Sequence, residues 1–162
     1  MLREFAKYPV DKINTPEYYV MRDKPMHRLG IGTTHAMKSV ITGVFIPVML
    51  LREYTPGEKI NVWRGKAMTT KTAGLWNKLV VTDLTMKVTK LEIPVYFCSG
   101  FYDYTVSFPL AKEYFNKLEA PVKGFYTFEK SAHSPLYEEP EKMQLILQED
   151  VLKGMTGLAD TK

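Results

Sequence analysis

The sequence predicts a mixed α/β fold, in which a helical segment is followed by a β-α-β-α unit with parallel strands. Two short apolar runs, at residues 93–98 and 125–129, are rich in β-branched and aromatic residues, which is typical of buried parallel strands. The stretch between them has apolar residues at the i, i+3, i+4 and i+7 spacing of an amphipathic helix, namely Ala111, Tyr114, Phe115 and Leu118.

Each strand run is followed by a loop that carries one titratable residue. The first run ends at Ser99-Gly100 and Asp103 comes next, while His133 follows the second run. The carboxyl ends of parallel strands meet at one edge of an open α/β sheet, where ligands bind. We therefore expect Asp103 and His133 to lie within a hydrogen bond of each other, at about 2.6–3.2 Å.

The N-terminal residues predict helices. The first runs from residue 16 to 23, with Thr15 as its N-cap and Pro16 at its first position. Pro25 disturbs it, and the glycines at positions 30 and 32 end the segment. Residues 1–14 contain turn signals only.

Further helices are predicted before the first strand. One covers residues 35–51, with Thr33 or Thr34 as its cap and Pro47 as a kink or break. It carries a wide apolar stripe of Met37, Val40, Ile41, Val44, Phe45, Val48 and Leu51. Residues 55–58 form a turn or begin the next helix, which covers 60–68. Another helix covers 72–84, and residues 86–91 lead into the strand.

The elements around the second strand follow from local signals. Ser107 and Pro109 mark the start of the intervening helix, and Pro121 and Gly124 mark its end. A final helix is predicted over residues 140–153 and is ended by Gly154, and the tail at 156–162 is predicted to be flexible.

Composition narrows the classes of function. At 162 residues the chain is long enough for one domain with a core, and its formal charge of +4 comes from scattered lysines rather than a basic patch that would bind nucleic acid. The single cysteine, Cys98, lies in a predicted buried strand, which excludes a disulfide scaffold and favours a reducing cytoplasm. We predict no signal peptide, because residues 1–7 have no apolar core followed by a small-residue cleavage site. We also predict no membrane span, because the longest apolar run, at 40–51, is too short.

The stretch from residue 91 to 140 carries a family resemblance. Its similar motifs are Ile93-Pro-Val-Tyr-Phe, Gly100-x-x-Asp103-Tyr104, Phe128-Glu-Lys-Ser-Ala-His133-Ser-Pro and Glu138-Glu-Pro-Glu-Lys. They resemble the C-terminal part of an α/β-hydrolase of the proline-iminopeptidase-like branch. In that family's Ser…Asp…His order, the resemblance makes Asp103 the catalytic acid and His133 the catalytic histidine. It also implies a helical cap and crossover at 1–90, part of the core at 91–155 and a tail at 156–162.

The nucleophile of such an enzyme is missing from the sequence. A nucleophile elbow needs small residues two positions before and after the serine. None of the candidate serines has them, at positions 39, 99, 107, 131 and 134, and no segment of the HGG type supplies an oxyanion hole. Cys98 lies inside a strand and is expected to be inert. We therefore expect the chain to begin after the elbow, partway through the cap.

Two weaker candidates for binding residues remain. His27 and His35 are a conceivable metal pair, but no third ligand stands at a suitable spacing. Glu17, Glu53 and Glu58 are candidates to bind a substrate's free amino group, as cap carboxylates do in iminopeptidases, or they are simply solvated helix residues.

These observations lead to two functional hypotheses. In the first, the chain is part of a serine hydrolase that acts on small peptides or ester-like substrates, needs no metal or organic cofactor, and is inactive alone. In the second, it is a catalytically inactive fragment that acts only as a self-associating or binding module. Under either hypothesis we expect a homo-oligomer, because strands that would flank the first strand are missing and both an edge and the apolar faces of the sheet would lack cover.

Overall fold

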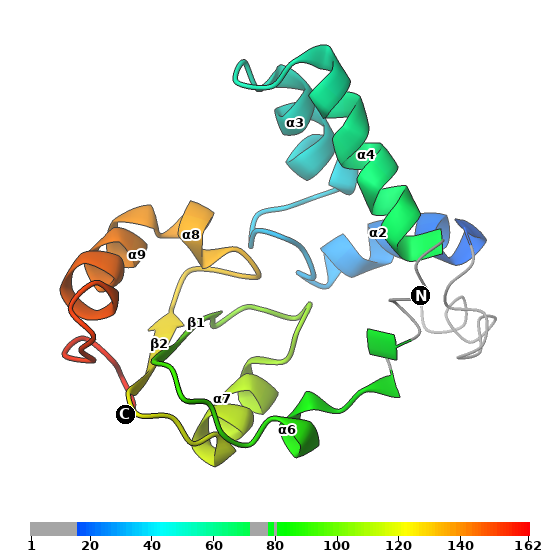
Figure 1. The fold of residues 1–162 in the computed structure, drawn as a ribbon. Coiled ribbons are helices and arrows are strands. Elements are labelled where there is room, and N and C mark those ends of the chain that lie inside the picture. Colours follow the sequence, from blue (N-terminus) through cyan, green and yellow to red (C-terminus); the bar gives the residue numbers. More distant parts are fainter. Residues whose placement is uncertain (1–15, 72–77, 80) are drawn as a thin grey trace.

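The computed structural model describes residues 16–71, 78–79 and 81–162, and it has a mixed α/β fold (Figure 1). The helices before the sheet are α2 (Pro16–Arg28), the π-helical turn η2 (Ile41–Phe45), α3 (Ile46–Leu50), α4 (Pro56–Lys71) and α6 (Leu84–Lys87). The second part contains β1 (Val95–Gly100), α7 (Phe108–Lys117), β2 (Lys123–Phe128), α8 (Pro135–Glu138), α9 (Pro140–Ile146) and the π-helical turn η3 (Leu147–Val151). None of the helices in these described parts is long and apolar enough to cross a membrane.

The predicted parallel pairing of the two strands is confirmed. β1 and β2 form a two-stranded parallel sheet, in register from Val95 opposite Lys123 to Gly100 opposite Phe128. The first strand begins two residues later than predicted, because Pro94 has no N–H to donate and the ladder starts with the bond from Val95 N to the Val122 carbonyl, 2.9 Å long. It also continues through Gly100, because Phe101 N still bonds to the Phe128 carbonyl at 2.9 Å.

Helices cover both faces of this sheet. On one face, the Phe115 ring of α7 lies 5.5 Å from the Phe97 ring and 5.4 Å from the Phe125 ring. On the other face, the buried Tyr126 and Phe128 pack with Ile146 of α9. Alternate residues of a strand point to opposite faces, which explains how each strand serves both layers. The expectation that the apolar faces lack cover is therefore wrong.

The C-terminal residues lie along the outer edge of β2. Phe125 N donates to the Thr161 carbonyl and Asp160 N donates to the Phe125 carbonyl, each at 2.9 Å. The buried side chain of Asp150 holds the preceding turn, since it accepts hydrogen bonds from Gly157 N at 2.8 Å and Leu158 N at 2.9 Å. The segment predicted to be a flexible tail is thus hydrogen-bonded to the sheet, and β2 has a neighbour on each side.

Two of the predicted helices have different bounds in the structure. α2 continues through Pro25 and ends at Arg28, because the Pro25 carbonyl still accepts from Leu29 N. Gly30, with a φ of 76°, follows its end. Its predicted cap, Thr15, lies outside the described residues. The helix predicted from residue 35 begins only at Val40, since residues 35–36 form a turn and residues 37–39 have no regular secondary structure. Pro47 does not break it; the π-helical turn η2 precedes the proline instead.

Side-chain caps explain the other differences before the sheet. α4 begins at Pro56, because Thr55 and Glu58 form a capping box, in which Glu58 N donates to Thr55 Oγ1 at 3.3 Å and Thr55 N donates to Glu58 Oε2 at 2.8 Å. Most of the helix predicted at 72–84 lies outside the described residues. The predicted lead-in to the strand contains the short helix α6, which Asp83 caps by accepting from Thr85 N at 2.9 Å.

The predicted helix at 140–153 is divided into α9 and the π-helical turn η3. Gly154, with a φ of 65°, follows it as predicted. The short helix α8, which directly follows the histidine loop, was not predicted from the sequence.

Candidate active site

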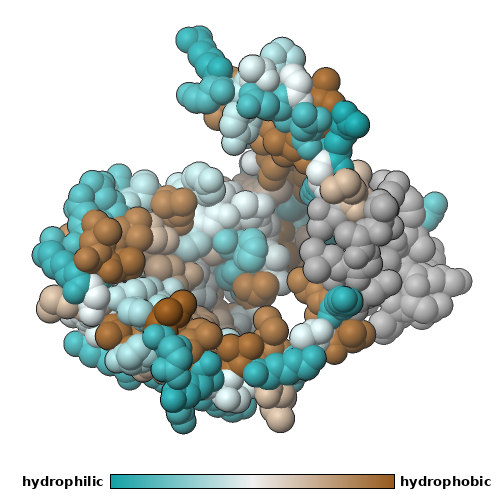
Figure 2. Space-filling model, viewed as in Figure 1, coloured by the Kyte–Doolittle hydropathy of each residue, from teal (hydrophilic) through white to brown (hydrophobic). Residues whose placement is uncertain are grey.

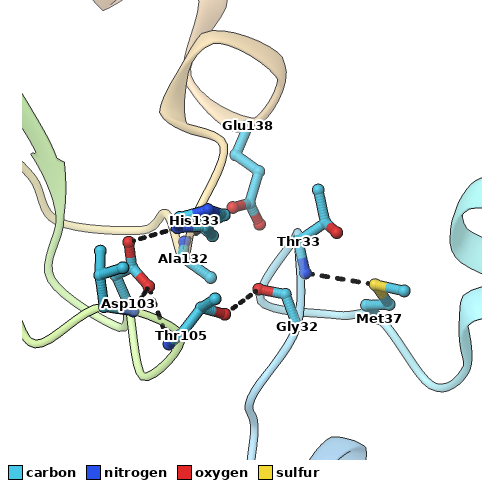
Figure 3. Close-up of polar contacts among 9 residues, drawn as sticks. Gly32, Thr33, Met37, Asp103, Thr105, Ala132, His133 and Glu138 are labelled. Atoms are coloured by element: carbon cyan, nitrogen blue, oxygen red, sulfur yellow. Dashed lines mark hydrogen bonds and ion pairs between the residues drawn. The ribbon is translucent and has the colours of Figure 1, made fainter. Parts of the chain in front are cut away.

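Asp103 and His133 meet at the carboxyl edge of the sheet, as Figure 3 shows. Asp103 lies on the loop after β1 and His133 on the loop after β2, and the two strands are parallel and adjacent. His133 Nδ1 lies 2.8 Å from Asp103 Oδ2, within the distance expected from the sequence. The Asp103 side chain is buried, whereas 42% of the His133 side chain is exposed. The catalytic role assigned to this pair stays a prediction.

The loop after β1 fixes the Asp103 carboxylate. Its Oδ1 accepts backbone hydrogen bonds from Thr105 at 2.9 Å and Val106 at 3.0 Å, so that Oδ2 is left for His133. An ionised carboxylate can accept all three bonds, because it has about four lone-pair sites. With Nδ1–H donated to Asp103, the neutral imidazole has its lone pair on Nε2.

A close backbone approach brings the two loops together. Tyr102 N donates to the Ser131 carbonyl at 3.0 Å, which draws the histidine loop against the end of β1. A Cβ atom at Gly100 would lie only 1.9 Å from the Ala132 carbonyl oxygen and 2.5 Å from that of Ser131. Only glycine fits at this position. The sequence placed a glycine at the strand end but gave no sign of what it faces.

Two glutamates of the following segment hold the histidine loop from the other side. Glu138 Oε2 accepts from Ala132 N at 2.7 Å, directly before His133. Glu139 Oε1 accepts from Lys130 N at 2.9 Å and from the buried Ser131 hydroxyl at 2.7 Å. These roles could not be read from the sequence, which singled out both glutamates only as part of a resembling motif.

His133 Nε2 has no hydrogen-bond partner in the parts of the chain that the structure describes, and no serine, threonine or cysteine there bonds to the ring. The Ser131 hydroxyl already donates to Glu139. Burial raises the pKa of the Cys98 thiol to about 11, and the opposing charge of Lys142 does not offset it, so this thiol stays protonated and inert at neutral pH. The arrangement can take up a proton, but it holds no nucleophile.

The weaker candidates have other contacts. His27 Nε2 lies 3.2 Å from Asp23 Oδ1, and the His35 ring stacks on Tyr102 with ring centres 4.0 Å apart. The described residues contain no group of three or more side chains that could hold a metal ion. Backbone and side-chain bonds from Thr55 lower the pKa of Glu58, which is engaged in its helix cap. Glu53 is exposed, and Glu17 lies in the first turn of α2.

The fold and this pair define a mixed α/β protein with an aspartate and a histidine at the carboxyl ends of adjacent parallel strands. Over 53 residues the chain is 43% identical to the probable aminopeptidase YbaC of Bacillus subtilis (strain 168). This alignment covers 33% of the present chain and 17% of that protein, so the chain matches only a small part of its relative. No family model matches the chain, and no solved structure matches it.

Proposed function

We propose that the chain is the acid- and histidine-bearing part of a serine hydrolase of the α/β-hydrolase type, with aminopeptidase-like activity on small peptides or esters. The observation that carries the proposal is the Asp103–His133 hydrogen bond of 2.8 Å, made by a histidine whose side chain is 42% exposed. The partial identity to a probable aminopeptidase supports the choice of a peptidase-like reaction.

The geometry of the pair supports a separate role for each residue. Asp103 holds the imidazole in the Nδ1–H tautomer and stabilises the imidazolium once it forms, as the acid of a triad does. His133 Nε2 takes the proton of a serine hydroxyl while that oxygen attacks the substrate carbonyl, and it then gives the proton to the leaving amine or alcohol. The serine and the oxyanion donors are supplied by residues that this sequence does not include.

The proposal predicts opposite labelling results for the 162-residue chain and for a chain extended upstream. The 162-residue chain, treated with a serine-selective fluorophosphonate, is expected not to be labelled, because no activated nucleophile faces His133 in the part that the structure describes. A reading frame extended upstream to an in-frame Gly-x-Ser-x-Gly segment is labelled and hydrolyses aminoacyl p-nitroanilides. There, Asp103→Asn and His133→Ala each lower kcat about 10³-fold or more, whereas Glu141→Gln at an exposed helix position does not. Stoichiometric labelling of the short chain, or full activity of the His133→Ala enzyme, contradicts the proposal.

A second candidate, self-association, is favoured by the outer edge of β1. No strand pairs with this edge in the described residues, and β1 contains neither a charged residue nor a proline to protect it. Large apolar side chains also lie exposed on the face shown in Figure 2, and Ile93, just before β1, is 63% exposed. We expect a dimer by light scattering at micromolar concentration, and a monomer for Ile93→Lys. A monomer in both cases rules this candidate out.

A further inference from the structure

We infer that Glu138 is a positioning residue for His133, and that it links the histidine loop to the segment after α2, residues 30–37. The inference rests on the proposed function, because it concerns the orientation of the proposed catalytic base. It assigns to the helical part of the chain a direct influence on the Asp103–His133 pair.

One carboxylate connects two segments that are far apart in the sequence. Glu138 Oε2 accepts from Ala132 N at 2.7 Å, and Glu138 Oε1 accepts from His35 N at 2.6 Å. Figure 3 shows Glu138 close to Ala132 and His133. Ala132 is buried and immediately precedes His133, so its amide fixes the backbone from which the imidazole projects. The bond from His35 crosses 103 residues of sequence and is exposed to solvent, whereas the bond from Ala132 is partly buried.

The same segment also contacts the loop that carries Asp103. The His35 ring is stacked on Tyr102, with planes 11° apart, and Thr105 Oγ1 donates to the Gly32 carbonyl over 3.5 Å. Thr105 in turn donates its backbone N–H to Asp103. Residues 30–37 are therefore linked to Asp103 through Thr105, and to His133 through Glu138 and the neighbouring Ala132.

The segment is itself held in a defined shape. The Met37 side chain is buried and its sulfur accepts from Thr33 N at 3.2 Å, which closes the turn that presents the His35 amide. Because this internal contact holds the segment in one conformation, the segment can fix the position of the histidine loop relative to α2.

A glutamate is the side chain that this bridge requires. Two N–H donors approach two different oxygens, and both oxygens of a carboxylate are acceptors. In glutamine one of the two positions becomes an NH₂ group, which faces an N–H donor and cannot accept from it. Glu138→Gln therefore breaks one of the two bonds in either orientation of the amide, while it keeps the size of the side chain.

The test follows three signals by NMR in the whole chain: the amide exchange rates of His35 and Ala132, and the Nδ1–H resonance of His133. In Glu138→Gln we expect exchange of at least one of the two amides to become about tenfold faster, since a charged acceptor is lost, and the His133 resonance to weaken. The matched control Glu141→Gln leaves all three unchanged. The Phe125 amide, which donates to Thr161 in the sheet, monitors global stability. Unchanged amide exchange in Glu138→Gln overturns the inference.

A second variant tests the link itself and does not alter Glu138. His35→Pro removes the donor on the helical side, and we expect faster exchange at Ala132 and a weaker His133 resonance. A His133 resonance equal to that of the unsubstituted chain overturns the coupling.

Failure of the proposed function gives a different result. Asp103→Asn is expected to abolish the His133 resonance and to leave the Ala132 amide protected. If the resonance survives in Asp103→Asn, the acid–histidine pair is disproved while the Glu138 bridge stands.

Discussion

Replacement of Gly100 by alanine is the sharpest test of how the sheet assembles the acid–histidine pair. The added methyl group meets backbone, not a flexible side chain: the Ala132 carbonyl oxygen at 1.9 Å and its carbonyl carbon at 2.8 Å. Real Cβ contacts essentially never fall below 3.0 Å, so the histidine loop must move away from β1 by about 1 Å.

A displacement of this size is large enough to break the hydrogen bond between His133 and Asp103. The His133–Asp103 bond is 2.8 Å long, and an added 1 Å takes the two atoms beyond hydrogen-bonding distance. The same movement strains the bond from Tyr102 N to the Ser131 carbonyl. Overpacking of this kind costs about 1–3 kcal/mol, and we expect the free energy of unfolding of Gly100→Ala to fall by at least that amount.

Chemical denaturation and the NMR signal of His133 Nδ1–H measure the two effects separately. Gly57→Ala is the matched control, because Gly57 lies in α4 with no atom within 4 Å of the added carbon, and alanine there is expected to be neutral or slightly stabilising. If Gly100→Ala retains both the stability and the His133 signal of the control, the close approach of the loops is not what holds the pair together.

The remaining predictions concern Asp150 and Cys98. Asp150→Asn should lower the free energy of unfolding by about 1–3 kcal/mol in urea titrations, because three donors, from Tyr126, Gly157 and Leu158, need two accepting oxygens. Burial works to raise the pKa of Asp150, but the hydrogen bonds from Tyr126, Leu158 and Gly157 outweigh it and leave that pKa below its usual 3.8. Its stabilisation should thus be present above pH 3.8 and be lost as the pH falls through the lowered value, whereas the asparagine variant should lack this part of the acid dependence. Cys98, with its raised pKa, should react with thiol reagents at neutral pH more slowly in the native chain than in the urea-unfolded chain; equal rates would contradict this.

The sequence predicted the features that depend on local pattern and strand order. Two short apolar runs and the β-α-β arrangement were enough to place Asp103 and His133 on neighbouring loops, because parallel strands end at a common edge. The residues that orient the pair were not predictable in the same way. The bond between Glu138 and the His35 amide joins positions that are 103 residues apart, and no local pattern marks such a contact.

The C-terminal tail illustrates the same limit. A short polar segment after a glycine has the composition of a frayed end. Its attachment to β2 depends on the buried carboxylate of Asp150, which accepts from Tyr126 OH at 2.7 Å as well as from two amides of the tail. An aspartate within an amphipathic helix is usually exposed, so no pattern in the sequence indicates that Asp150 lies in the core.

Under the proposed function, the elements that surround the sheet restrict where the nucleophile can lie. The outer edge of β2 is occupied by residues 160 and 161, and α7 and α9 cover the two faces. In the described residues, β1 alone offers N–H and C=O groups without a strand beside them. A strand of uncharged residues resembles an interior strand of a parallel sheet, which is normally paired on both sides. Under the proposed function, we therefore expect further strands, with the serine at the carboxyl end of one of them, to pair with the open edge of β1.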